Sequence, residues 1–118
     1  MPLTIYHNPR CSKSRATLAL LEEAGAAPDV VLYLETPPSG GRILKLAGLL
    51  GVPVRELLRT GEAEVAEAAD LPDLADDAAL AAWISRHPRA LQRPIVVDDN
   101  TGRARIGRPP ENVRDLLP

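Results

Sequence analysis

Cysteine and aromatic side chains are scarce in this 118-residue sequence, which has one Cys, no Phe and only 3% aromatic residues. A single cysteine can form neither a disulfide within the chain nor the Cys-x-x-Cys pair of a dithiol oxidoreductase. Any thiol redox chemistry therefore needs a second thiol from outside. Hydrophobic residues still make up 45% of the sequence, so Leu, Val, Ile and Ala suffice for the core of one domain.

Long hydrophobic runs and a strong net charge are also absent. No stretch approaches the ~18 apolar residues that a membrane span requires, and the N-terminus lacks the pattern of a signal peptide. The formal net charge of -2 provides no field that attracts nucleic acid or an anionic membrane. We therefore expect a cytoplasmic protein that binds neither, and we expect it to act as a monomer.

The first third of the chain predicts a strand, a helix and a second strand. Residues 3–6 and 29–34 are β-prone runs, and the apolar spacing between them predicts a helix that starts at Ser12, where serines can cap it. Gly25 is expected to end this helix. Because so few residues join the two strands, they are expected to pair in parallel as a βαβ unit.

The rest of the chain predicts a helical insertion followed by two strands and a helix. Helices are expected over 42–51, 53–61 and 76–87, and the acidic, Ala-rich segment 62–77 is interpreted as a solvated helical face with a loop. The strand-like runs 94–97 and 103–107 flank DDNTG, a hairpin-turn sequence, and 109–118 predicts a short helix with Pro at its start. The prediction is one α/β domain over 1–118, with an insertion at about 40–88 and a mixed four-stranded sheet.

The only cysteine lies in the sequence YHNPRCSKSR, where the first strand passes into the first helix. Unpaired N–H groups at a helix N-terminus stabilise a thiolate, and the positive charges of Arg10, Lys13 and Arg15 act in the same direction. A free thiol with a pKa of ~8.5 is only a few per cent ionised at neutral pH. This setting suits a nucleophile. The alternative is a buried structural cysteine, which the polar neighbours of Cys11 disfavour.

The order βαβ, insertion, ββα, with a thiol at the start of the first helix, is the plan of a thioredoxin-like fold. Pro94 occupies the place where such folds carry a cis proline beside the active thiol, so we predict a cis Arg93–Pro94 bond, against the ~5–6% frequency of cis X-Pro bonds in general. One Cys and two His far apart form a poor ligand set. We expect no metal and no bound cofactor.

Motifs along nearly the whole chain resemble the glutaredoxin-coupled arsenate reductase family, ArsC-like proteins of thioredoxin-like fold. They are YHNPRCSKSRATLALLEEAG, LYLETPP, RELLR, RPIVV and IGRPPE, and they occur in the family's order. The chain departs from the best-studied members of the family in two features, SKSR after Cys11 and an end at Pro118 without a C-terminal extension. In both features it resembles the shorter YfgD-type subgroup. Lys13 adds a charge near the expected anion site and is expected to affect substrate preference.

The resemblance implies an enzyme in which Cys11 attacks arsenate, glutathione is the co-substrate and glutaredoxin resolves the mixed disulfide. It also implies that Arg59, Arg93 and Arg108 bind the oxyanion. A planar guanidinium can bond two oxygens of a tetrahedral anion at once. For any single arginine the alternative is a solvated surface residue, and the prolines after Arg93 and Arg108 could reflect turn geometry.

Several further residues are implied to support the thiol. His7 is expected to help hold Cys11 in its ionised form, although a histidine that pairs with backbone in a turn is an equal alternative. Asn8 and Ser14 are expected to organise the loop by hydrogen bonds and to reach the anion. Arg15 is expected to add positive charge.

Two other functions are compatible with the sequence. One is a glutathione- or glutaredoxin-linked thiol oxidoreductase that acts on another oxyanion or on protein mixed disulfides. The other is an Spx-type transcriptional regulator, which binds RNA polymerase and does not catalyse a reaction. The lack of a Cys-x-x-Cys pair and the retention of the three arginines argue against the regulator.

Overall fold

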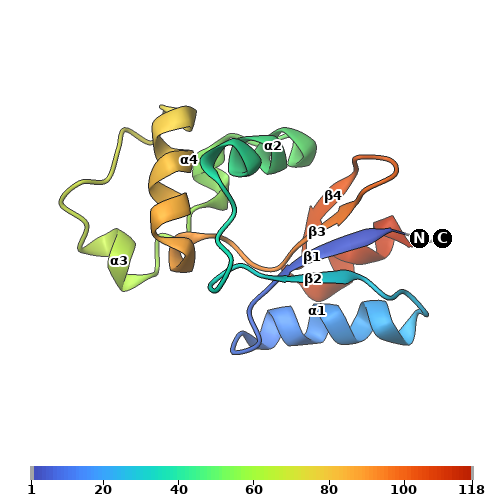
Figure 1. Cartoon of the computed structure of the whole chain (residues 1–118). Coiled ribbons are helices and arrows are strands. Elements are labelled where there is room, and N and C mark those ends of the chain that lie inside the picture. The colour runs from blue at the N-terminus through green and yellow to red at the C-terminus, as the bar shows by residue number, and fades with distance from the viewer. Residues whose placement is uncertain (1, 118) are drawn as a thin grey trace. The chain divides into compact units, whose positions relative to one another are not determined.

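The computed structural model describes residues 2–117, which form two compact units (Figure 1). Unit 1 combines the chain up to Tyr33 with the chain from Arg93 onward, and unit 2 spans Leu34–Gln92. Within the described residues, no helix is both long and apolar enough to cross a membrane.

Unit 1 contains a four-stranded sheet in the order β2-β1-β3-β4. The strands are β1 (Leu3–His7), β2 (Asp29–Leu32), β3 (Ile95–Asp98) and β4 (Ala104–Ile106). β1 pairs in parallel with β2 and antiparallel with β3, and β3 pairs antiparallel with β4. The sheet is therefore mixed, and the predicted α/β class and parallel βαβ unit are confirmed.

The core of unit 1 lies between the sheet and two helical segments, α1 (Ser12–Glu23) and η3 (Pro110–Leu116), a 3₁₀ helix. Both segments contact the sheet and each other, α1 being the blue helix in Figure 1. The buried cluster consists of Leu3, Ile5, Leu21, Val96, Val113 and Leu116. Because side chains alternate along a strand, Leu3 and Ile5 share the face of β1 that meets α1.

The ends of two elements in unit 1 differ from the prediction. Cys11, rather than a serine, occupies the N-cap position of α1. β2 stops at Leu32 instead of residue 34, because its partner β1 ends at His7, the residue paired with Leu32. The short helix predicted near the C-terminus forms as the 3₁₀ helix η3, with a proline at its start as predicted. Gly25 adopts φ +84° just after α1 and ends it as predicted, because glycine reaches this conformation without strain.

Unit 2 is helical. Its elements are α2 (Gly40–Leu50), η1 (Val54–Leu57), α3 (Ala63–Ala66), α4 (Asp77–Arg86) and η2 (Pro88–Ala90). The side chain of Ser39 accepts from the N–H of Arg42 to cap α2, and that of Asp76 accepts from the N–H of Ala79 to cap α4. α2 packs against α4, and a Cβ on Gly40 would come within 3.3 Å of the Ala82 backbone.

The helix predicted over 53–61 is wrong in extent, since only the four-residue 3₁₀ helix η1 forms there. The backbone beyond it pairs with a distant segment instead. Leu58 and Leu91 form an antiparallel bridge, the N–H of Arg59 donates to the oxygen of Ala90 at 2.7 Å, and the N–H of Gln92 donates to the oxygen of Leu57 at 2.8 Å. These bonds replace the i→i−4 bonds that a longer helix would need.

Candidate active site

The topology of unit 1 brings three separate segments to one end of the sheet. β3 runs antiparallel to β1 and β4, with Tyr6 paired to Ile95 and Ile95 to Ile106. The residues after β1, before β3 and after β4 therefore leave the sheet at the same end. These segments carry Cys11, the Arg93–Pro94 pair and Arg108.

Asn8 shapes the loop between β1 and α1. Its backbone oxygen accepts from the N–H of Cys11 at 3.0 Å, and its Oδ1 accepts from the N–H of Arg10 at 3.0 Å. Such bonds from an Asn side chain to the backbone two residues on are typical of tight turns. The side chain of Arg15 donates to the oxygen of Pro9 at 2.9 Å and ties the loop to α1. Cys11 is thus held at the helix start.

His7 and Ser14 form a buried pair beneath this loop. Nδ1 of His7 lies 2.7 Å from Oγ of Ser14, which also accepts from the N–H of Asn8 at 3.0 Å. Burial lowers the pKa of His7, and the charge of Arg15 lowers it further, while Glu22 acts to raise it. A neutral His7 leaves the Ser14 hydroxyl free to donate to Nδ1 while it accepts from Asn8. The lowered pKa favours the neutral form of His7, and its bond to Ser14 joins the end of β1 to the first turn of α1.

The Cys11 thiol is half-buried, and its pKa is lowered. Burial by itself acts to raise the pKa. The N–H of Ser14, the guanidinium of Arg93 and the N–H of Lys13 outweigh that effect, because each stabilises the thiolate. This is the combination of helix N-terminus and cation that produces reactive cysteines.

Two arginines approach the sulfur from the segments beside the loop. Nη1 of Arg108 lies 3.9 Å from Sγ of Cys11 and also donates to the backbone oxygen of Arg93 at 3.3 Å. The Arg93 side chain hydrogen-bonds the same thiol. The Arg93–Pro94 bond is cis, which confirms the sequence prediction, and the Arg108–Pro109 bond is cis as well. The side chains of Arg93 and Arg108 therefore place two guanidinium groups beside the Cys11 sulfur.

Arg59 belongs to unit 2. It follows η1, and its N–H is held by the oxygen of Ala90. Its Nε lies 3.9 Å from a carboxylate oxygen of Glu62, whereas its Nη1 has no hydrogen-bond partner among the described residues. A guanidinium nitrogen without a partner remains available to an anion.

Two residues of the site region, Thr17 and Gly107, are missed by sequence reasoning. Thr17 is completely buried in α1, and its hydroxyl donates to the oxygen of Lys13 at 2.8 Å. The same hydroxyl lies 3.4 Å from the oxygen of Gly107, which precedes Arg108. The glycine of IGRPPE is a weak signal for a close backbone approach, and the sequence contains none for Thr17.

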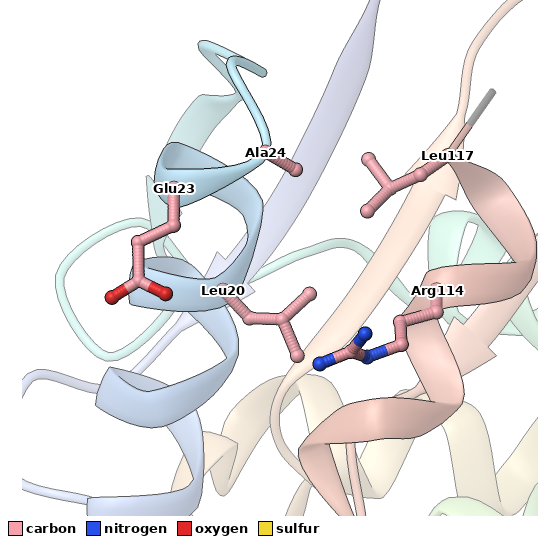
Figure 2. Close-up of a pocket in the computed structure, with 5 residues that line it drawn as sticks. All are labelled: Leu20, Glu23, Ala24, Arg114 and Leu117. Atoms are coloured by element: carbon pink, nitrogen blue, oxygen red, sulfur yellow. The ribbon is translucent and has the colours of Figure 1, made fainter.

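A surface hollow of unit 1 lies between the end of α1 and η3, away from Cys11, which is at the start of α1. Its lining residues are Leu20, Glu23, Ala24, Arg114 and Leu117 (Figure 2). Within residues 2–117, no three His, Cys, Asp or Glu side chains are grouped so that they could hold a metal.

The mixed sheet, the thiol at the start of α1 and the adjacent cis proline define a thioredoxin-like protein. Residues 6–116 match the ArsC family profile. The chain is 47% identical to protein YfgD of Escherichia coli strain K12 over 116 residues, covering 96% of this chain and 94% of YfgD. It is 45% identical over 117 residues to an arsenate reductase of Neisseria meningitidis serogroup A, covering 98% and 97% of the two chains.

A solved structure is similar over the whole chain. The arsenate reductase from Vibrio cholerae superposes with a TM-score of 0.91 and 47% identity, covering 99% of this chain and 98% of that one. The chain belongs to the ArsC family.

Proposed function

We propose that this chain reduces arsenate to arsenite, with Cys11 as nucleophile, glutathione as co-substrate and glutaredoxin as the protein that resolves the mixed disulfide. The observation that carries the proposal is the placement of Arg93 and Arg108 around the low-pKa thiol of Cys11. Relatives that are 40–45% identical over nearly the whole chain, and are arsenate reductases by name, support it.

The positive groups serve both the thiolate and the anion. Arsenate is a tetrahedral anion, and a thiolate that attacks it must overcome the repulsion between two negative charges. Guanidinium groups next to the sulfur offset that repulsion and can bond the arsenate oxygens in pairs. Arg59, whose Nη1 lacks a partner, is proposed as the third oxyanion ligand, with residues 1–118 working as a single domain that includes the helical insertion.

The proposed reaction is covalent catalysis by a thiolate. The Cys11 sulfur bonds to arsenic, and a hydroxide is displaced and leaves as water. Glutathione then forms a disulfide with Cys11, the two electrons of the sulfur–arsenic bond remain on arsenic, and arsenite leaves. A glutaredoxin thiolate attacks the mixed disulfide at the glutathione sulfur and frees Cys11. One disulfide forms for each two-electron reduction of arsenic, so the electrons balance.

The surrounding residues are proposed to position the thiol. Asn8 closes the loop, His7 and Ser14 support it from below, and Arg15 ties it to α1. We further propose that the protein acts as a monomer in the cytoplasm, where the glutathione and glutaredoxin systems keep thiols reduced.

The test is arsenate-dependent NADPH oxidation in a coupled assay with glutathione, glutathione reductase and glutaredoxin. Wild-type protein should turn over, and Cys11→Ser should not. Arg59→Ala, Arg93→Ala and Arg108→Ala should each lower kcat/KM by about 10²-fold, the scale for removing one group that stabilises an oxyanion. Arg103→Ala, an exposed arginine of the β3–β4 hairpin, is the matched control and should retain wild-type activity.

Each outcome of this assay has a definite meaning. No arsenate turnover by a wild-type protein whose thiol titrates at low pKa rejects arsenate as the substrate. The same assay with a glutathionylated peptide then tests for a thiol oxidoreductase acting on mixed disulfides. Turnover that survives Cys11→Ser rejects the proposed chemistry altogether, since this sulfur is the only thiol of the chain.

A further inference from the structure

Gly107 lies at a crowded point of unit 1, where the segments that carry the thiol and two arginines meet. It is buried, follows β4 and immediately precedes Arg108. Its N–H donates to the oxygen of Pro94 at 2.9 Å, and its own oxygen lies 3.4 Å from the hydroxyl of Thr17. Pro94 follows Arg93, and Thr17 belongs to α1, which begins directly after Cys11. Gly107 therefore contacts the residue after Arg93 and the helix that begins after Cys11.

The contacts around Gly107 leave no room for a side chain. A Cβ built there would overlap Oγ1 of Thr17, lie 2.8 Å from Cγ of Pro94 and lie 3.0 Å from Cγ2 of Thr17. The requirement is one of space rather than backbone conformation, since Gly107 is not among the glycines with positive φ, which are Gly25, Gly51 and Gly102. Close packing makes even one added methyl group move its neighbours.

We propose that Gly107 is a positioning residue whose missing side chain, held against Thr17 and Pro94, sets how closely Arg93 and Arg108 approach Cys11. A methyl group at position 107 would press on Pro94 and on α1 together. Arg93 precedes Pro94 and Arg108 follows Gly107, so a shift of Pro94 and Gly107 would move both guanidinium groups relative to the sulfur. The part of this inference that concerns turnover rests on the proposed function, whereas the part that concerns the thiol does not.

The test compares Gly107→Ala with the double variant Gly107→Ala, Thr17→Ala and with Thr17→Ala alone. In the single Gly107→Ala variant the Cys11 pKa, measured by thiolate absorbance without arsenate, should rise toward its ordinary value. Its kcat/KM for arsenate should fall by between about tenfold and about 10²-fold. The upper figure is the loss that a 1 Å misplacement can cause. The double variant lacks both contacts with Thr17 but keeps the contact with Pro94, so it should recover both quantities in part toward those of Thr17→Ala.

A matched control separates this effect from glycine replacement in general. A Cβ at Gly48, in α2, would meet no atom within 4 Å, so Gly48→Ala should leave the thiol pKa and kcat/KM unchanged. Thermal unfolding of every variant identifies any that fail to fold. If Gly107→Ala does not fold, the double variant should restore folding and part of the lowering of the thiol pKa.

Two results would overturn the positioning role of Gly107. A Gly107→Ala protein with wild-type thiol pKa and kcat/KM would overturn it, and so would a loss that Thr17→Ala does not relieve even in part. If the wild type shows no arsenate turnover, the proposed function fails, yet the thiol titrations of the same variants still decide the role of Gly107.

Discussion

Nδ1 of His7 lies 2.7 Å from Oγ of Ser14, and both side chains are buried. This bond joins the last residue of β1 to the first turn of α1, on either side of Cys11. The Ser14 hydroxyl also accepts from the N–H of Asn8. One oxygen atom thus holds together the two elements between which the thiol lies.

Ser14→Ala should destabilise the protein measurably. It removes the partner of His7 and of the Asn8 N–H, and a buried polar group left without a partner costs about 1–3 kcal/mol. We expect a loss of that size in the free energy of unfolding, measured by urea denaturation. Ser12→Ala, at an exposed position of the same helix, should change it by less than ~0.5 kcal/mol. Equal effects of the two substitutions would contradict the role given to Ser14.

Arg93→Gln should raise the pKa of the Cys11 thiol, because it removes the guanidinium that stabilises the thiolate. Where the pKa lies above the pH, each unit of increase leaves about tenfold less thiolate. The rate of alkylation by iodoacetamide, measured against pH, should show its midpoint shifted upward. Arg103→Gln, on the hairpin, should keep the wild-type midpoint. An unshifted midpoint in Arg93→Gln would show that the helix start and Arg108 lower the pKa without Arg93.

The free energy of unfolding should decrease as the pH is lowered, because of His7. Its folded-state pKa is lowered, so the unfolded chain binds the proton more tightly. The contribution is fully present above the unfolded value of about 6.5 and is lost as the pH falls through the folded pKa. Urea denaturation at two pH values, one above and one below about 6.5, should give a smaller difference for His7→Gln than for wild type. Equal differences would show that His7 is not the titrating group.

The indole N–H of Trp83 donates to Oδ1 of Asp70 at 3.2 Å in unit 2. Asp70→Ala leaves this buried ring without its acceptor and should cost about 1 kcal/mol. Asp70→Asn keeps an oxygen in place and should cost less. Trp83 is the only tryptophan in the chain, so its fluorescence in urea reports the effect directly. Equal losses in the two variants would indicate that charge, rather than the hydrogen bond, matters.

The order of the elements could be read from the sequence because local signals agree with the fold. Turn residues, apolar spacing and Gly25 define the strand–helix–strand unit, and DDNTG defines the hairpin between β3 and β4. The segment after η1 could not be predicted, since RELLR has good helical spacing. Its backbone pairs instead with residues 90–92, a non-local contact that propensity does not describe.

In the candidate site, too, some features follow from local sequence and others depend on contacts between distant residues. Cys11 and the cis proline at Arg93–Pro94 follow from their place in the chain order. The neutral state of His7 does not, because it depends on burial beside Ser14. Thr17 resembles any other residue of an amphipathic helix, and its contact with Gly107 spans 90 residues of sequence. Such a contact forms only in the folded protein, so local sequence patterns do not predict it.

The division of unit 1 into two distant chain segments has a consequence for synthesis on the ribosome. β1 emerges first, but β3, which completes its second edge, lies beyond the whole of unit 2. β1 therefore lacks its partner β3 while residues 34–92 are made. Non-local strand pairing of this kind is slow to form. Arg93 and Arg108 also follow unit 2 in the sequence. Until they have been made, only the N–H groups at the start of α1 can stabilise the Cys11 thiolate.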